Sequence, residues 1–114
     1  VLEVSGDGRT TILLMSEIRI RAMRSPELAA AYLALGEEMV KSVEQIIREL
    51  STAHGLTFRT SPIEVARLLI MLYEGASARA AMAGFDDAAI AATVSDEIGA
   101  LALLLVVPPA HPAG

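Results

Sequence analysis

The side chains that could act as nucleophiles, general bases or metal ligands are few in this sequence and widely separated. There is no cysteine, and the two histidines, His54 and His111, have no glutamate three or four residues away, the spacing at which helices build metal sites. The glycines of residues 5–8 (SGDG) lack the preceding strand and the lysine of a phosphate-binding loop, and no serine has a plausible neighbouring base. We therefore expect no enzymatic activity, no metal and no cofactor.

The composition favours a single domain of packed helices. Of the 114 residues, 54% are hydrophobic but only 4% are aromatic, so the core must be built from aliphatic and alanine side chains. The absence of cysteine is typical of a reducing compartment. The longest apolar run, residues 100–107, is shorter than the roughly 20 residues that cross a bilayer, and the net charge of −5 repels phosphate backbones. We expect an all-α, cytoplasmic domain that contacts no membrane and does not bind DNA by itself.

Two helices are predicted in the first half of the chain, over residues 10–24 and 26–53. Ser25, Pro26 and Glu27 form a start signal: a side-chain cap, a proline where no amide proton is needed, and a carboxylate at the positive end of the helix. Gly55 is placed to end the second helix. The second helix has the clearest apolar periodicity, with spacings of three and four residues among Leu28, Tyr32, Leu35, Gly36, Met39, Val43, Ile46, Ile47 and Leu50.

Two further helices are predicted over residues 62–83 and 86–106. Ser61, Pro62 and Glu64 form a capping box, and Asp86 with Asp87 opens the last helix. The helical domain thus spans residues 10–107. A lead-in loop over residues 1–9 precedes it, and we expect the tail over residues 108–114 to be disordered.

The third predicted helix is apolar around most of its circumference, and its second half consists largely of alanine, serine and glycine. Such a helix must be covered on more than one side, and its small residues allow a neighbouring backbone to come close. Four short helices offer too little area to cover every apolar stripe internally. We therefore expect a homodimer; the alternative is that these stripes form only the core of one subunit.

Three features resemble the C-terminal half of tetracycline-repressor (TetR) family regulators, over about residues 9–106. SEIRIRAMRSPELAAAYLAL, residues 16–35, is similar to the family's passage of glutamate, alanine, then arginine-x-proline-glutamate-leucine between two regulatory helices. In ARLLIMLYEGASARA, residues 66–80, Glu74 and Gly75 stand where the family often has an acidic residue and a glycine. The third feature is the order of elements, a medium helix, a long helix and a hairpin of two helices.

The resemblance implies a ligand-sensing and dimerising domain that is separated from its DNA reader. Family members begin with a three-helix unit of helix-turn-helix type, which the residues before Thr10 cannot supply. We expect that unit to be encoded upstream of Val1, so that DNA binding belongs to the parent protein. In the family, a small molecule shifts the population of helix arrangements and thereby the spacing of two DNA readers.

The resemblance also implies an intersubunit four-helix bundle, made by the last two helices of each subunit. The contact residues predicted for this dimer interface are Leu68, Leu72, Gly75, Ala76, Arg79, Ala83, Val94, Ile98, Leu101 and Leu105.

In the family the ligand lies among the core helices, which correspond here to the first three predicted helices. Arg19 would pair with an anionic ligand or reach solvent, and Glu74 would hold a cationic ligand or belong to an ordinary polar strip. For each methionine and tyrosine the alternative is a plain core position. We expect a small apolar or amphipathic ligand, and the candidate ligand-binding residues are Met15, Arg19, Met23, Tyr32, Gly36, Met39, Val43, Met71 and Glu74.

A different class of function fits the same helices. A complete dimeric adaptor would bind a protein partner and have no ligand pocket. Stabilisation of the domain by a small molecule would favour the sensor, whereas retention by a protein partner without any such response would favour the adaptor.

Overall fold

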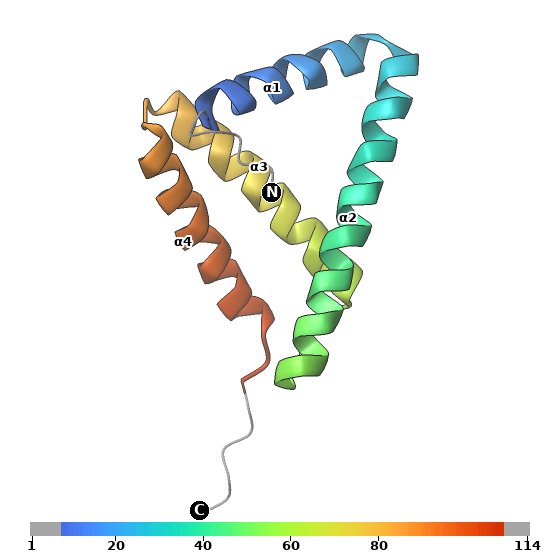
Figure 1. Ribbon diagram of the computed structural model, residues 1–114, viewed down its shortest axis with the longest axis vertical. Coiled ribbons are helices and arrows are strands. Elements are labelled where there is room, and N and C mark those ends of the chain that lie inside the picture. Colours follow the sequence, from blue (N-terminus) through green and yellow to red (C-terminus); the bar gives the residue numbers. More distant parts are fainter. Residues whose placement is uncertain (1–7, 109–114) are drawn as a thin grey trace, which may run out of the picture.

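The computed structural model describes residues 8–108, and within that range it contains four α-helices (Figure 1). They are α1 (Gly8–Arg24), α2 (Pro26–His54), α3 (Pro62–Met82) and α4 (Asp87–Leu105). Apart from an isolated β-bridge between Phe58 and Val106, the described residues contain no β-structure, so the predicted all-α class is confirmed. The predicted disorder of residues 109–114 and the predicted loop over residues 1–7 lie outside the described residues.

Three helices begin at the caps that the sequence predicts. Ser25, Ser61 and Asp86 are the N-caps of α2, α3 and α4, and their side-chain oxygens accept hydrogen bonds from backbone N–H groups three residues further on, at 3.3, 3.4 and 2.8 Å. Each bond satisfies a donor that the helix itself leaves unpaired. Gly55 ends α2 with a φ of 63°, which glycine adopts without steric cost.

The first helix begins two residues earlier than predicted, at Gly8. Its first turn is attached to the far end of the chain: the Arg9 backbone N–H donates to the Asp87 carboxylate at 3.1 Å, and the Arg9 guanidinium donates to the Ala81 carbonyl at 2.6 Å. These bonds connect residues far apart in the sequence. They hold the first turn of α1 against α3 and α4.

The central element is α3, which packs against a different neighbour along each half (Figure 1). Its first half and the second half of α2 share one buried cluster, and its second half and α4 share another. Three alanines in these clusters allow the helices to approach closely. The first, which we call the α2–α3 cluster, consists of Val40, Ile47, Val65 and Ala66. The second, which we call the α3–α4 cluster, consists of Ala80, Ala81, Ile90 and Val94.

The loop between α2 and α3 holds the C-terminal end of α4. The backbone N–H of Arg59 donates to the Leu105 carbonyl at 2.7 Å, and its guanidinium donates to the Leu104 carbonyl at 3.0 Å. A positive charge is favourable at this negative end of a helix. Phe58, in the same loop, is partly buried against the α2–α3 cluster.

Candidate functional site

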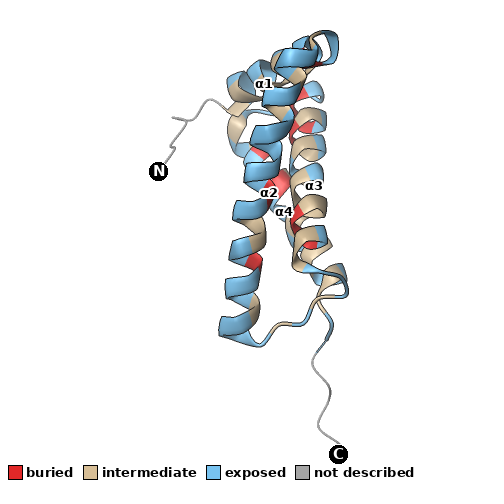
Figure 2. Ribbon diagram, turned by 90° about the vertical axis from the view of Figure 1, so that its right-hand side faces the viewer, coloured by how far each residue is buried: buried red, intermediate tan, exposed pale blue. Residues whose placement is uncertain are grey.

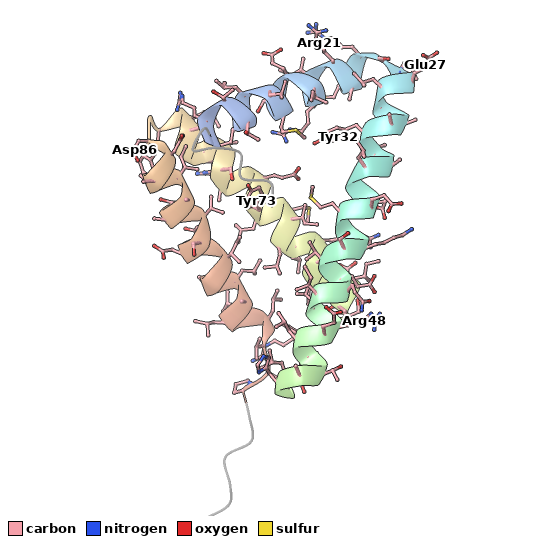
Figure 3. The ribbon with its side chains drawn as sticks, viewed as in Figure 1. Arg21, Glu27, Tyr32, Arg48, Tyr73 and Asp86 are labelled. Atoms are coloured by element: carbon pink, nitrogen blue, oxygen red, sulfur yellow. The ribbon has the colours of Figure 1, made fainter. Side chains whose placement is uncertain are left out.

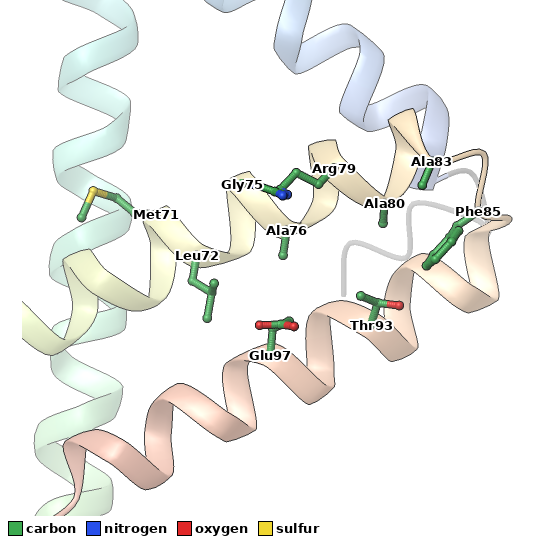
Figure 4. Close-up of a pocket in the computed structure, with 10 residues that line it drawn as sticks. All are labelled: Met71, Leu72, Gly75, Ala76, Arg79, Ala80, Ala83, Phe85, Thr93 and Glu97. Carbon is green, nitrogen blue, oxygen red and sulfur yellow. The ribbon is translucent and has the colours of Figure 1, made fainter.

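An open groove runs between α3 and α4 on one face of the subunit (Figure 4). It has a volume of about 750 Å³, and we call it the α3–α4 groove. The residues that line it are Met71, Leu72, Gly75, Ala76, Arg79, Ala80, Ala83, Phe85, Thr93 and Glu97.

The sequence of α3 explains why the groove is there. Gly75, Ala76, Ala80 and Ala83 recur at helical spacing, so the side of α3 that faces the groove carries little side-chain volume. A β-carbon added to Gly75 would meet no atom within 4 Å, which shows that the subunit itself does not require glycine at this position. The small residues therefore leave room for something outside the subunit.

Two opposite charges border the groove. Arg79 extends from α3, and Glu97 extends from α4 (Figure 4). Neither takes part in an ion pair among the residues that the structure describes, whose pairs join Arg19 to Glu74, Arg48 to Glu44, and Arg67 to both Glu37 and Glu64. The groove thus combines an apolar floor with one basic and one acidic side chain at its margin.

The predicted dimer-interface residues divide into two groups in the structure. Leu72, Gly75, Ala76 and Arg79 on α3, and Ala83 at its C-cap, line the α3–α4 groove. The α4 residues lie closer to the subunit's own core: Val94 is only 6% exposed, Ile98 packs against the same α3–α4 cluster, and Leu105 packs against the α2–α3 cluster. Leu68 and Leu101 are half-buried.

Sequence reasoning missed five groove residues: Met71 as an interface residue, and Ala80, Phe85, Thr93 and Glu97 altogether. Thr93 and Glu97 are polar, so they fall outside the apolar stripe from which the α4 contacts were predicted. Their spacing of four residues places them on one helix face, next to the buried face that carries Ile90 and Val94. That neighbouring position is the signal that would have identified them.

The candidate ligand-binding residues lie on α1, α2 and α3. Arg19 and Glu74 do meet, with nitrogen and oxygen 3.7 Å apart, and they bridge α1 and α3. Tyr32 is half-buried and projects from α2 toward the side on which α1 and α3 lie (Figure 3). Of the others, Met15 is half-buried, Gly36 and Met39 are exposed, Met23 is 80% exposed, Val43 packs against the α2–α3 cluster and Met71 lines the α3–α4 groove.

The last helix is long and apolar enough, by length and composition alone, to cross a membrane. Two of its features favour packing within protein. Asp96 and Glu97 stand near its middle, where a charged residue costs about 2.5–3.5 kcal/mol in a bilayer, and Ile90 and Val94 are buried against α3. We therefore interpret α4 as half of a helical hairpin with α3.

No protein-family model matches the chain, and comparisons with curated proteins and with solved structures find no match. The resemblance to TetR regulators therefore rests on the two sequence passages and on the order of the helices.

Proposed function

We propose that this chain is the small-molecule-sensing and dimerisation domain of a TetR-like transcriptional regulator whose DNA-binding unit lies elsewhere in the parent protein. One observation carries the proposal. The α3–α4 groove, open and largely apolar, lies on the face of α3 from which the dimer contacts were predicted, and five of the six predicted α3 residues line it.

A second copy is the occupant that best suits this groove. In a two-fold dimer the same surface meets itself, so α3 and α4 of two subunits form a four-helix bundle and Leu72 of each subunit enters the other's groove. Arg79 of one subunit then lies on the same side as Glu97 of the other, and opposite charges meet across the axis. Met71 and Met82, 59% and 79% exposed, would become buried at the edges of this contact.

The sensing part of the proposal rests on the way α1 is held. Its first turn is bonded to α3 and α4, whereas its second half meets α3 through the long side chains of the Arg19–Glu74 pair, which are 29% and 42% exposed. Such a pair contributes little to stability, about 0–1 kcal/mol. A charged or amphipathic ligand that competes for either side chain would move α1 relative to α3, and α3 also carries the dimer face.

Sedimentation equilibrium and thermal unfolding in the presence of a panel of amphipathic small molecules test this function. We expect a dimer, and a rise in melting temperature with at least one compound. Tyr32→Ala should abolish that rise, while Leu33→Ala, its exposed neighbour on another side of α2, should preserve it. A monomer at all concentrations would refute the dimer, and a melting temperature that responds to no compound would refute the sensor.

The adaptor is the second candidate, because the same groove supports dimerisation without any ligand. A dimer that responds to none of the compounds and binds a protein partner through a surface outside the α3–α4 groove would be an adaptor.

A further inference from the structure

The long helix α2 contains an eleven-residue repeat. Residues 27–37 read ELAAAYLALGE, residues 38–48 read EMVKSVEQIIR, and the next copy begins with Glu49 and Leu50. Eleven residues make three turns of a slightly underwound helix, so equivalent positions stay on one side along the whole element. Each copy begins with glutamate followed by leucine or methionine, and has another large aliphatic side chain, Leu35 or Ile46, eight residues after that glutamate.

The repeat produces an exposed apolar line on α2, which we call the α2 stripe. Its members are separated by seven, four, seven and four residues, which is helical periodicity for one face. Figure 2 shows that α2 is exposed along most of its length. The stripe consists of Leu28, Leu35, Met39, Ile46 and Leu50, and their exposed fractions are 36%, 69%, 55%, 54% and 44%.

An acidic line accompanies the stripe. Glu27, Glu38 and Glu49 open the successive repeats, and each directly precedes a stripe residue in the sequence. All three are exposed, and none takes part in an ion pair among the described residues. The other two glutamates of α2 do have cationic partners: Glu37 lies 3.7 Å from Arg67, and Glu44 lies 2.8 Å from Arg48. The two glutamates outside the line are thus neutralised by cations, whereas the three in the line have no cationic partner among the described residues; Glu49 accepts a hydrogen bond from the Gln45 side chain at 3.4 Å.

This arrangement favours one kind of occupant, a basic amphipathic helix. The α2 of a second copy would place acidic line near acidic line, and like charges at close range oppose binding. A helix with an apolar seam and Lys or Arg beside it would cover the stripe and meet the three carboxylates. These recur every eleven residues, or about 16 Å along the axis at 1.5 Å per residue.

We propose that the α2 stripe docks a basic amphipathic helix from another polypeptide, with its apolar seam on Leu35, Met39 and Ile46 and its cations on Glu27, Glu38 and Glu49. This surface is separate from the α3–α4 groove, and it shares Met39 with the candidate ligand-binding residues.

A synthetic helical peptide tests the proposal in the full chain by fluorescence anisotropy. The peptide carries leucine at the seam positions and lysine at an eleven-residue interval; a scrambled peptide of the same composition is its control. We expect the patterned peptide to bind roughly tenfold or more tightly than the scrambled one, and less tightly as salt is raised.

Two charge-reversed variants with the same net charge distinguish binding by the acidic line from non-specific attraction between a basic peptide and an acidic protein. The double variant Glu38→Lys with Glu49→Lys should bind the peptide roughly tenfold or more weakly than the wild type does. The same variant should bind a peptide that carries glutamate in place of lysine. Glu17→Lys with Asp96→Lys, both exposed positions outside the line, should bind the original peptide as wild type does. Equal weakening in both chains would overturn the proposal.

A variant in the α2 stripe tests the alternative that the stripe is a contact between copies of this chain. Leu35→Gln should leave the circular dichroism spectrum and the sedimentation coefficient unchanged and should weaken peptide binding, since Leu35 is exposed. If this variant instead dissociates the protein into monomers, the stripe is a contact between copies of the chain, and the proposal is wrong.

Discussion

Gly75 provides a test in which fold stability and dimerisation move in opposite directions. It is an exposed residue in the middle of α3, it lines the α3–α4 groove, and a β-carbon there would meet no atom of the subunit within 4 Å. Gly99 on α4 is also helical and exposed with the same free space, but it does not line the groove. Gly75→Gln and Gly99→Gln are therefore a matched pair.

The expected magnitudes follow from helix propensity and from packing. Glycine in a helix is less favourable than glutamine by about 0.5 kcal/mol, so both replacements should stabilise the fold by about that amount. In a dimer closed at the groove, the new side chain of Gly75→Gln would occupy space meant for the partner. Overpacking of this kind costs about 1–3 kcal/mol, which corresponds to a rise in the dimer dissociation constant of roughly 5- to 150-fold.

Sedimentation equilibrium over a concentration series measures association, and urea denaturation at a fixed, dilute concentration measures stability. We expect Gly99→Gln to associate like the wild type and Gly75→Gln to associate more weakly, with no loss of helix content in either. If Gly75→Gln dimerises as tightly as Gly99→Gln, the groove is not the dimer contact, and the argument from small residues on α3 fails.

Three further outcomes are expected. Ala76→Glu should weaken association by roughly tenfold or more because it places a charge in the groove, whereas Glu44→Ala should change it little, since it removes only an exposed pair with Arg48; equal effects in sedimentation would place the interface elsewhere. Ala66→Leu should destabilise the fold by about 1–3 kcal/mol in urea denaturation, because Ala66 is fully buried where α2 meets α3; a neutral result would show that this contact is loose. Asp86→Ala should lower the free energy of unfolding by about 1 kcal/mol and Asp86→Asn by less, because only the alanine removes the oxygen that caps α4; similar losses in both would point to charge rather than capping.

The boundaries of the helices were predictable where they depend on neighbouring residues. Ser25, Ser61 and Asp86 are local signals, since a cap and the N–H groups it satisfies lie within one turn. The start of α1 at Gly8 was predicted two residues too late, although Asp7, a residue type favoured as an N-cap, directly precedes it in the sequence. The bonds from Arg9 to Ala81 and Asp87 were not predictable from neighbouring residues, because such contacts exist only when the chain has folded.

Ion pairs were likewise predictable within one helix but not between two helices. The acid-before-base order along α2 favours pairs of Glu37 with Lys41 and of Glu44 with Arg48. The second pair is present at 2.8 Å, but Glu37 lies 3.7 Å from Arg67 of α3. Periodicity identifies which residues share a helix face. It does not identify which other helix that face will meet.

The candidate site was predictable on α3 and less so on α4 for a related reason. A stripe of apolar residues can face the subunit's own core or a partner, and both give the same spacing. On α3 the small side chains distinguish the two, because Gly75 has no role in the core. On α4 nothing in the stripe distinguishes them, so Val94, which is buried in its own subunit, was predicted as a contact with another.

The distribution of large aliphatic side chains implies two separate occupants rather than one. Four of the nine buried apolar residues described are alanines, so most of the leucine and methionine lies outside the core. The α3–α4 groove and the α2 stripe are two parts of the exposed apolar surface, and others lie on α1, at Leu13, Leu14 and Met23. In the fold, α2 and α4 flank α3 on opposite sides (Figure 1). A second copy seated in the groove would leave the stripe in water, because α3 stands between them. A helix seated on the stripe would likewise leave the groove open, so shielding both faces requires a dimer and an additional helix.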